Sequence, residues 1–391
     1  MRKNHIKGFA LATAAVFGLL ACGGSSSSTD TTAAPVTTDA AADYSMLKVA
    51  VVYIGVPDDK GWTYQHEQGI LALEAELGIE VKRVENVPEG DEGEAIMEGL
   101  AAEGYNLIFA TSFGYGTPMA RVAAKHADGC FQWATGAKFL LTAEMGGEYA
   151  TFGDIPANLG TYFGAAEEAR YLSGMIAASV SKTGRLGYVA AFPIPEVVRG
   201  INAFELGAQA INPKATTKVV WTSTWYDPTI ESKAAQSLLN AGVDVLAQHQ
   251  DSPATGQAAE AVGARWLSYN SNMQTLAPKA WAGGPGWDWG PFYTAQAKAV
   301  IDGTWKSEQY YGNMKDGLVK LFGPAEDVPA DAAAAVKAAQ DAFVAGTAHP
   351  FDGPIADQAG KTEVAQGATA PMDALMSMQY FVKGVQGTIA K

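Results

Sequence analysis

The sequence predicts an α/β protein with two lobes, each built around a parallel sheet, joined by a hinge of several chain crossings. Three observations predict this fold class. Short β-branched strands alternate with amphipathic helices up to about residue 136, the alternation restarts after Gly160, and 391 residues suffice for two domains. Strands separated by helices at this spacing form right-handed βαβ units, whose helices cover both faces of a parallel sheet.

The first 45 residues are predicted to lie outside the folded lobes. Residues 1–22 combine Arg2, Lys3 and an apolar core too short to span a bilayer, which is typical of an export signal. The signal ends in "LLAC", so Cys22 is the expected lipidation site of a lipoprotein; the alternative is a plain signal peptide that ends in a chance cysteine. Residues 23–45 are rich in Gly, Ser, Thr and Ala and are expected to form a flexible tether.

The first lobe is expected to contain residues 46–160 and about 287–325. Its strands are predicted from β-branched runs and its helices from apolar positions at helical spacing, as in the helix that ends at Gly78. The expected strands are 47–54, 79–87, 105–112 and 130–136, and the expected helices are 64–78, 89–104 and 116–127.

The second lobe is expected to contain residues 161–286 and about 326–391. A long helix over 163–181 is predicted to lead into it. The strands expected after this helix are 185–192, 217–225, 243–250 and 265–271, and the helices are 195–211, 229–242 and 253–263. The C-terminal part includes predicted helices over 290–303 and 329–346. It is too small to fold alone and is expected to complete both lobes by crossing between them.

Loops at the predicted strand ends carry many aromatic side chains. Ligands of parallel α/β sheets bind at the carboxyl ends of the strands, so these loops are predicted to face a cleft. The aromatic residues in these loops are Trp62, Tyr64, Phe113, Tyr115, Phe192, Trp225 and Tyr226. Stacking on a nucleobase contributes about 1–3 kcal/mol per base and tolerates substituents at the ring edge. We therefore expect a flat aromatic ligand held by two or three of these rings, above all Trp62 and Trp225, while the others pack between the lobes.

Polar side chains at the same strand ends are candidates for hydrogen bonds to the polar edge of that ligand. Carboxylates accept hydrogen bonds, and an amide both donates and accepts, which makes Asp251 and Asn270 suitable. One of Asp58 and Asp59 is expected to contact the ligand, although an aspartate here is more often a helix cap. Asp251 lies in the cluster "HQDSP", and the alternative is that it caps the helix starting at Pro253.

Composition and missing motifs argue against other classes of function. The formal net charge of −14 argues against a basic face for nucleic acid. No G-x-S-x-G, H-E-x-x-H, C-x-x-C, P-loop or dinucleotide-binding pattern occurs, and the five histidines lie in separate segments. We expect no catalytic residues, no metal site and no cofactor.

Several long segments resemble one known family, the basic membrane protein family of ABC-transporter substrate-binding lipoproteins. The segments that carry the resemblance are "GWTYQHEQG", "VENVPEG", "ATSFGYGTP", "YVAAFPIPEVVRGINAFELGA", "WYDP", "HQDSPA", "MKDG" and "PFDGPI". The resemblance covers nearly the whole predicted mature chain and implies the type I periplasmic-binding-protein fold, with two Rossmann-like lobes that close on a solute.

The resemblance also implies a function and roles for individual residues. Members of the family mostly bind purine nucleosides or bases and deliver them to a permease with its ATPase in the inner membrane, and a lipid anchor would hold this chain on the periplasmic face. Trp62 and the "HQDSP" cluster are similar to the purine-base type, adenine in particular. The expected roles are stacking for Trp62 and Trp225, edge recognition for Asp251 and Asn270, and pocket walls for Tyr64 and Phe192.

One departure from the family pattern affects the expected ligand. Related sequences tend to read Y-D-S-D-M where this chain has "YNSNM", so that Asn270 and Asn272 replace acids. If the first acid binds an amino group or a ribose hydroxyl in the family, the amide of Asn270 alters that preference. Within the binding class, the alternative ligands are another flat heterocycle or a sugar-like solute. The alternative from another class of function is a surface signalling lipoprotein without a transport role.

Overall fold

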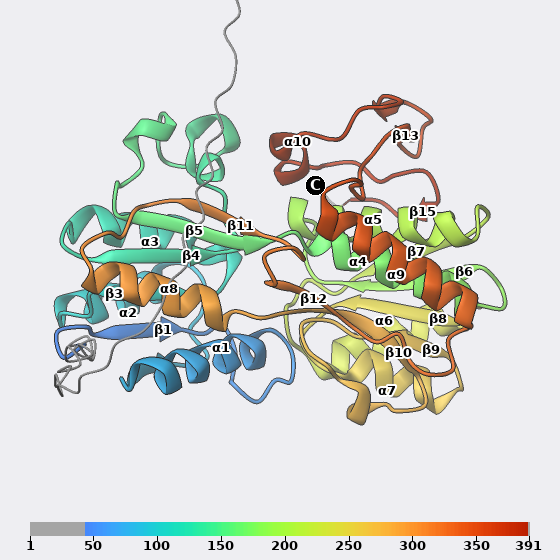
Figure 1. Ribbon diagram of the computed structural model, residues 1–391, viewed down its shortest axis with the longest axis horizontal. Helices are drawn as coiled ribbons and strands as arrows, with labels where there is room; N and C mark the ends of the chain where they lie inside the picture. Colours follow the sequence, from blue (N-terminus) through green and yellow to red (C-terminus); the bar gives the residue numbers. More distant parts are fainter. Residues whose placement is uncertain (1–43, 390–391) are drawn as a thin grey trace, which may run out of the picture. The chain divides into compact units, whose positions relative to one another are not determined.

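The first lobe is built on a parallel sheet with the strand order β11–β5–β4–β3–β1–β2. The computed structural model describes residues 44–389, and Figure 1 shows this sheet with α1, α2, α3 and α8 around it. The strands are β1 (Val49–Val52), β2 (Val81–Val84), β3 (Leu107–Ala110), β4 (Cys130–Ala134), β5 (Leu159–Gly164) and β11 (Gln309–Gly312). The helices are α1 (Trp62–Leu77), α2 (Asp91–Ala102), α3 (Gly116–Lys125) and α8 (Gly290–Ile301).

The sequence of β1 explains why this sheet is covered on both faces. Val49 and Val51 pack in the core with α1 and α8, whereas Ala50 and Val52 pack in a separate cluster with α2 and α3. Successive side chains of a strand point to opposite faces, so a strand that is buried on both sides reads as a continuous apolar run.

The second lobe has a sheet with the order β12–β10–β9–β8–β6–β7–β15, parallel except for the antiparallel pair β10–β12. Its faces are covered by α4 and α5 on one side and by α6 and α7 on the other. The strands are β6 (Arg185–Ala190), β7 (Thr216–Trp221), β8 (Val245–His249), β9 (Arg265–Leu267), β10 (Trp281–Trp287), β12 (Val319–Phe322) and β15 (Val385–Gln386). The helices are α4 (Ala166–Val180), α5 (Pro195–Ile211), α6 (Pro228–Asn240) and α7 (Ala254–Ala261).

Within residues 44–389 the chain passes between the two sheets three times. The crossings run from β5 to α4, from β10 to α8 and from β11 to β12. Trp287 and Trp289 lie at the second crossing, where their rings stack with centroids 5.1 Å apart, and both are buried. The predicted fold class is confirmed, and these crossings form the hinge.

Up to residue 325, four strands differ from the elements that the sequence pattern indicated. Residues 159–164 form β5, although the predicted helix began at Phe163; helix α4 begins only at Ala166. Strands β10, β11 and β12 were not expected. The sequence of β10, "WAGGPGW", has three glycines and a proline, which are poor strand formers. Pairing with β9 and β12 and complete burial hold it as a strand. Strand β12 also lies in the second sheet, whereas residues 287–325 were expected in the first lobe.

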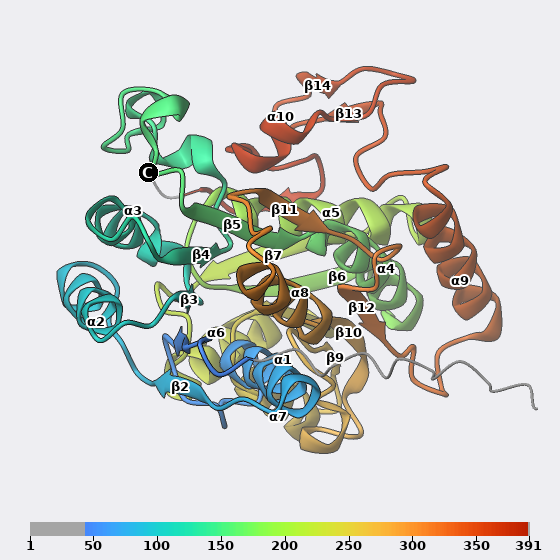
Figure 2. The ribbon, with the colours of Figure 1, turned by 60° about the vertical axis from the view of Figure 1, so that its left-hand side comes forward.

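The C-terminal residues pack on the second lobe. Helix α9 (Ala330–Ala345) lies on α4, and α10 (Met372–Met376) lies against α5. Figure 2 shows α10 near the hairpin of β13 (Ile355–Ala356) and β14 (Thr362–Val364). Strand β15 then adds to the edge of the second sheet beside β7. The crossing expected for the chain after about residue 289 is the passage from β11 in the first sheet to β12 in the second.

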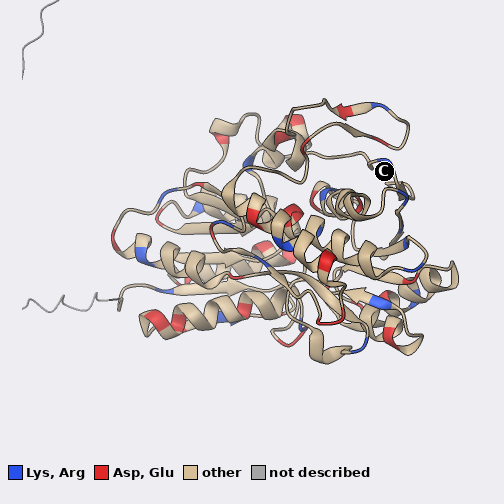
Figure 3. Ribbon diagram, turned by 45° about the vertical axis from the view of Figure 1, so that its right-hand side comes forward, with Lys and Arg blue, Asp and Glu red and all other residues tan. Residues whose placement is uncertain are grey.

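The expected export signal, Cys22 and nearly all of the expected tether lie outside the described residues. No helix in the described part of the chain is both long and apolar enough to cross a membrane. Figure 3 shows acidic and basic positions distributed over the elements of both lobes, in keeping with 41 acidic and 27 basic residues in the whole sequence.

Candidate functional site

A cavity lies between the carboxyl ends of the strands of the two sheets. The free space within it is small, about 20 Å³, compared with the roughly 300–1,000 Å³ typical of small-molecule sites. The first lobe contributes Ile54, Trp62, Ser112, Phe113 and Thr135 to the lining. The second lobe contributes Glu196, Trp225, His249, Asp251, Tyr269 and Asn270. The cavity lies where the alternating strands and helices predicted a cleft.

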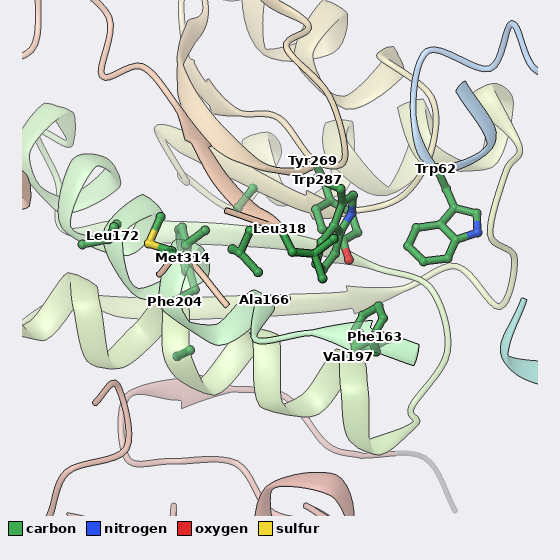
Figure 4. Close-up of a cluster of buried hydrophobic side chains, with 14 of the residues drawn as sticks. Trp62, Phe163, Ala166, Leu172, Val197, Phe204, Tyr269, Trp287, Met314 and Leu318 are labelled. Atoms are coloured by element: carbon green, nitrogen blue, oxygen red, sulfur yellow. The ribbon is translucent and has the colours of Figure 1, made fainter. Parts of the chain in front are cut away.

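Trp62 lines the cavity from the first turn of α1, and only 7% of it is exposed. Its indole Nε1 donates a hydrogen bond to the carbonyl oxygen of Thr111, at 2.7 Å. Figure 4 shows its ring beside Phe163 and Trp287, and its centroid lies 6.2 Å from each of theirs. The ring is therefore held in one orientation at the cavity wall before any ligand enters.

Trp225 lines the same cavity from the loop after β7 and is half-buried. Its ring meets Phe192 edge-on, with centroids 4.9 Å apart. Phe192 lines a neighbouring pocket of about 330 Å³, which shares Trp225, Asp251 and Ile54 with the cavity. Phe113 lines the cavity itself, next to the ring of Trp133.

Tyr64 and Asp59 are not among the cavity-lining residues. Tyr64 is half-buried near Lys60, whose Nζ lies 5.8 Å from the centre of its ring. Both carboxylate oxygens of Asp59 accept backbone N–H groups in and just before the first turn of α1, from Gly61, Thr63 and Tyr64. Asp59 thus caps α1 and also lines the neighbouring pocket.

Asp251 and Asn270 are brought together by the fold. The amide Nδ2 of Asn270 donates to Oδ1 of Asp251 at 2.9 Å, and its Oδ1 accepts from the indole Nε1 of Trp287 at 2.9 Å. An amide serves both partners, whereas a carboxylate here would need a proton to donate to Asp251. Residue 270 also has φ of 72°, a conformation that asparagine adopts more readily than most residues. These contacts and this backbone conformation suit an asparagine at position 270.

Three cavity residues of the second lobe were not expected as ligand contacts: Glu196, His249 and Tyr269. Glu196 is at the start of α5, and its Oε1 lies 3.1 Å from Nε2 of His249. The rings of His249 and Tyr269 have centroids 4.5 Å apart, and the guanidinium of Arg170 lies 3.6 Å from the centre of the Tyr269 ring. One indication of these residues was present in the sequence: His249 ends β8, and Tyr269 follows the neighbouring strand β9.

Several polar atoms around the cavity have no hydrogen-bond partner among residues 44–389. These atoms are Oε2 of Glu196, Nδ1 of His249, Nε1 of Trp225 and the hydroxyl of Tyr269. A buried polar group without a partner costs about 1–3 kcal/mol, so native proteins rarely leave several together. Four such atoms around one cavity are expected where a bound polar ligand supplies the missing hydrogen-bond partners.

Burial shifts the ionisation of the acids and the histidine in this site. It raises the pKa of Glu196 to about 7, although the charges of Arg199 and Arg170 oppose the rise. It lowers the pKa of His249 well below its usual value. Burial, with the charges of nearby acids, also raises the pKa of Asp251 well above its usual range. At neutral pH the cavity wall therefore contains a neutral imidazole beside a carboxyl near its midpoint of titration.

The two lobes are in contact over the cavity. Ser271 of the second lobe donates through its hydroxyl to the carbonyl oxygen of Lys60 in the first lobe. A Cβ atom added to Gly61 would lie 2.2 Å from the carbonyl oxygen of Asp251, which shows how closely the two backbones approach. The structure is therefore a closed form, in which these loops cover the cavity.

The described residues contain no group of three or more His, Cys, Asp or Glu side chains placed to hold a metal ion. Of the expected site residues, the fold gathers Trp62, Phe113, Trp225, Asp251 and Asn270 around one cavity. It places Phe192 and Asp59 in the adjoining pocket and Tyr64 outside both.

A family model described as "Bmp: ABC transporter substrate-binding protein PnrA-like" matches residues 46–346. The chain belongs to this family. Members are substrate-binding proteins of ABC transporters, so this Bmp-family chain is an extracytoplasmic binding protein of such a transporter and not an enzyme.

Named relatives of this Bmp-family chain include proteins with two kinds of ligand in their names. A purine-binding protein of Brucella abortus is 41% identical over 341 residues, which are 87% of this chain and 93% of the relative. A putative ABC transporter glucose-binding protein of Haloferax volcanii is 38% identical over 281 residues, 71% and 68% of the two chains. A solved ABC transporter solute-binding protein of Aeropyrum pernix has a TM-score of 0.65 at 18% identity, covering 84% and 95% of the two chains, and supports the fold.

Proposed function

We propose that this protein captures a purine base, with adenine favoured, in the cavity between its lobes and delivers it to the permease and ATPase of its transporter in the inner membrane. The observation that carries the proposal is the pair of tryptophans, Trp62 and Trp225, that the two lobes contribute to one closed cavity. An aromatic wall from each lobe suits a flat ring, which would gain stacking contacts only when the lobes close around it.

The polar atoms of the cavity support a nitrogen heterocycle as the ligand. The indole N–H of Trp225 is a donor, the carboxyl of Glu196 offers an oxygen, and the hydroxyl of Tyr269 both donates and accepts. A purine carries donors and acceptors around its rim and apolar faces above and below, which matches this distribution. The purine-binding relative in Brucella abortus, similar over 87% of this chain, supports the same ligand class.

A purine nucleoside is the second candidate, and the neighbouring pocket favours it. That pocket shares Trp225 and Asp251 with the cavity and is lined in addition by Asp59, Asn86, Ser223 and Thr224. Its carboxylates, amide and hydroxyls are groups that would hydrogen-bond the hydroxyls of a ribose attached to the base.

A ligand panel tests the proposal by thermal unfolding. A ligand that binds only the folded form raises its stability by RT ln(1 + [L]/Kd), about 2.7 kcal/mol at 100 times Kd. We expect adenine to raise the melting temperature of the ligand-stripped protein by several degrees, adenosine less, and glucose not at all. A rise with glucose and none with adenine, adenosine or guanosine would replace the purine by a sugar.

We further propose that Cys22 carries a lipid that anchors the mature chain at the periplasmic face of a membrane. The sequence "LLAC" followed by a Ser- and Thr-rich segment supports this anchor. In cells, the native chain is expected in the membrane fraction and a Cys22→Ser variant in the soluble fraction. Equal distribution of the two forms would rule out lipid anchoring.

A further inference from the structure

Glu196 and His249 form a buried pair on the cavity wall of the second lobe. Glu196 is 8% exposed and His249 4%, and the pair is joined through Oε1 and Nε2 at 3.1 Å. Each member has one more polar atom, Oε2 of Glu196 and Nδ1 of His249, without a partner in the described chain. Both residues line the cavity, so both free atoms are available to a ligand there.

The surroundings of the pair fix the position of the imidazole. The ring of Tyr269 packs on that of His249, and the guanidinium of Arg170 covers the ring of Tyr269. Arg170 is itself tied to the second sheet, because its Nη1 donates to the carbonyl oxygen of Gln248 at 2.7 Å. The imidazole is thus packed between fixed groups, which suits a role in recognition.

The two polar residues first expected to contact the ligand edge, Asn270 and Asp251, are partly engaged with other groups. Asn270 uses both amide atoms on Asp251 and Trp287. Oδ1 of Asp251 accepts from this amide, which leaves that side chain a single free oxygen. The contacts first expected from Asn270 therefore have to come from other residues.

From this geometry we propose that Glu196 and His249 together read the polar edge of the bound ring and select a ring that carries an amino group next to a ring nitrogen. Oε2 of Glu196 accepts a hydrogen bond from the amino group, and Nδ1–H of His249 donates to the ring nitrogen. Nε2 of His249 then accepts the proton of the Glu196 carboxyl, so that the pair is neutral and every polar atom of it has a partner. The inference rests on the proposed purine function and names the residues that give it specificity.

The chemistry of the site agrees with this arrangement of protons. The carboxyl of Glu196, with a pKa of about 7, carries a proton in a large share of molecules at neutral pH, whereas the lowered pKa of His249 keeps its imidazole neutral. An aminopyrimidine edge, as in adenine, offers the matching donor and acceptor. A monosaccharide has no ring nitrogen to accept from Nδ1.

The test compares adenine with purine, which lacks the amino group, in native and variant proteins. In the native protein we expect adenine to bind at least about 10-fold more tightly than purine. In Glu196→Ala this ratio is expected to fall towards 1, because the partner of the amino group is gone. The matched control is Glu205→Ala: Glu205 is also a buried glutamate of α5, but it bonds Thr217 and Gln209 and does not line the cavity. This control is expected to keep the ratio.

A second variant covers the case in which Glu196→Ala does not fold. In His249→Gln the side-chain amide can still reach Glu196, but no atom remains at the position of Nδ1. Adenine and purine both offer the ring nitrogen, so both are expected to bind about 10-fold more weakly. Calorimetry of all variants, after circular dichroism has shown that they are folded, gives the affinities.

The outcomes separate the inference from the proposed function. An unchanged adenine-to-purine ratio in Glu196→Ala, or unchanged affinities in His249→Gln, overturns the role of the pair while the purine function stands. Failure of the native protein to bind either base overturns the proposed function itself.

Discussion

Replacement of Trp62 by leucine is expected to weaken purine binding by about 10- to 100-fold. Stacking of an aromatic side chain on a base contributes about 1–3 kcal/mol, and about 1.4 kcal/mol corresponds to tenfold in affinity. Trp62 is also nine-tenths buried and packs on His66, with ring centroids 4.2 Å apart. The variant should therefore lose stability too, by less than the roughly 3–5 kcal/mol of a Trp→Ala change. Calorimetry measures the first effect and denaturant unfolding the second.

Trp289→Leu is the matched control for this experiment. Trp289 is fully buried in the same aromatic cluster, with its ring centroid 5.9 Å from that of Trp62, but it does not line the cavity. We expect it to lose a similar amount of stability and to keep its affinity for the purine. If Trp62→Leu also kept its affinity, stacking on Trp62 would not hold the ligand.

Replacement of Gly61 by alanine is expected to prevent the lobes from closing. The added Cβ would lie 2.2 Å from the carbonyl oxygen of Asp251 and 2.7 Å from its Cα, and backbone atoms cannot rotate aside as a flexible side chain can. Gly61 belongs to the first lobe and Asp251 to the second, so the clash is relieved when the lobes move apart. The clash lies at the contact between the two loops, so the variant should fold. Its affinity for the ligand should fall at least about 10-fold, because contacts made by both lobes favour the closed state.

Small-angle scattering with and without saturating ligand measures this effect. The radius of gyration of the native protein is expected to decrease on binding, and that of Gly61→Ala is expected to stay nearly constant. Gly99→Ala serves as the control, because a Cβ atom there has no neighbour within 4 Å and alanine favours the helix α2. A Gly61→Ala protein that compacts and binds like the native one would show that the approach of Gly61 to Asp251 does not govern closure.

Much of the fold could be predicted because local patterns and tertiary structure agree. Helix α1 has apolar positions at helical spacing and ends at Gly78, which has the positive φ of a helix stop. Strand β10 could not be predicted, since its glycines and proline oppose strand formation and only pairing with its neighbours holds it. Local patterns therefore fail where long-range contacts decide the structure, as at the hinge.

In the candidate site, too, some residues could be predicted from local sequence patterns and others could not. The cavity position of Trp62 and Trp225 follows from the rule that strand ends face the cleft, and both residues line the cavity. Glu196 could not be predicted as a ligand contact, because an acid in the first turn of a helix is commonly explained by its favourable interaction with the helix dipole. The roles of Asn270 depend on Asp251 and Trp287, which are 19 and 17 residues away and meet it only in the folded chain.

Calorimetric titration of the ligand-stripped protein with adenine, and then with adenosine and glucose, tests the central claim most directly. The closed cavity with a tryptophan from each lobe predicts a Kd for adenine of about 1 μM or lower, or about 8 kcal/mol of binding free energy. It predicts weaker binding of adenosine and no heat of binding with glucose. Tight binding of glucose, with no heat of binding for adenine or adenosine, would contradict the proposal that the ligand is a purine.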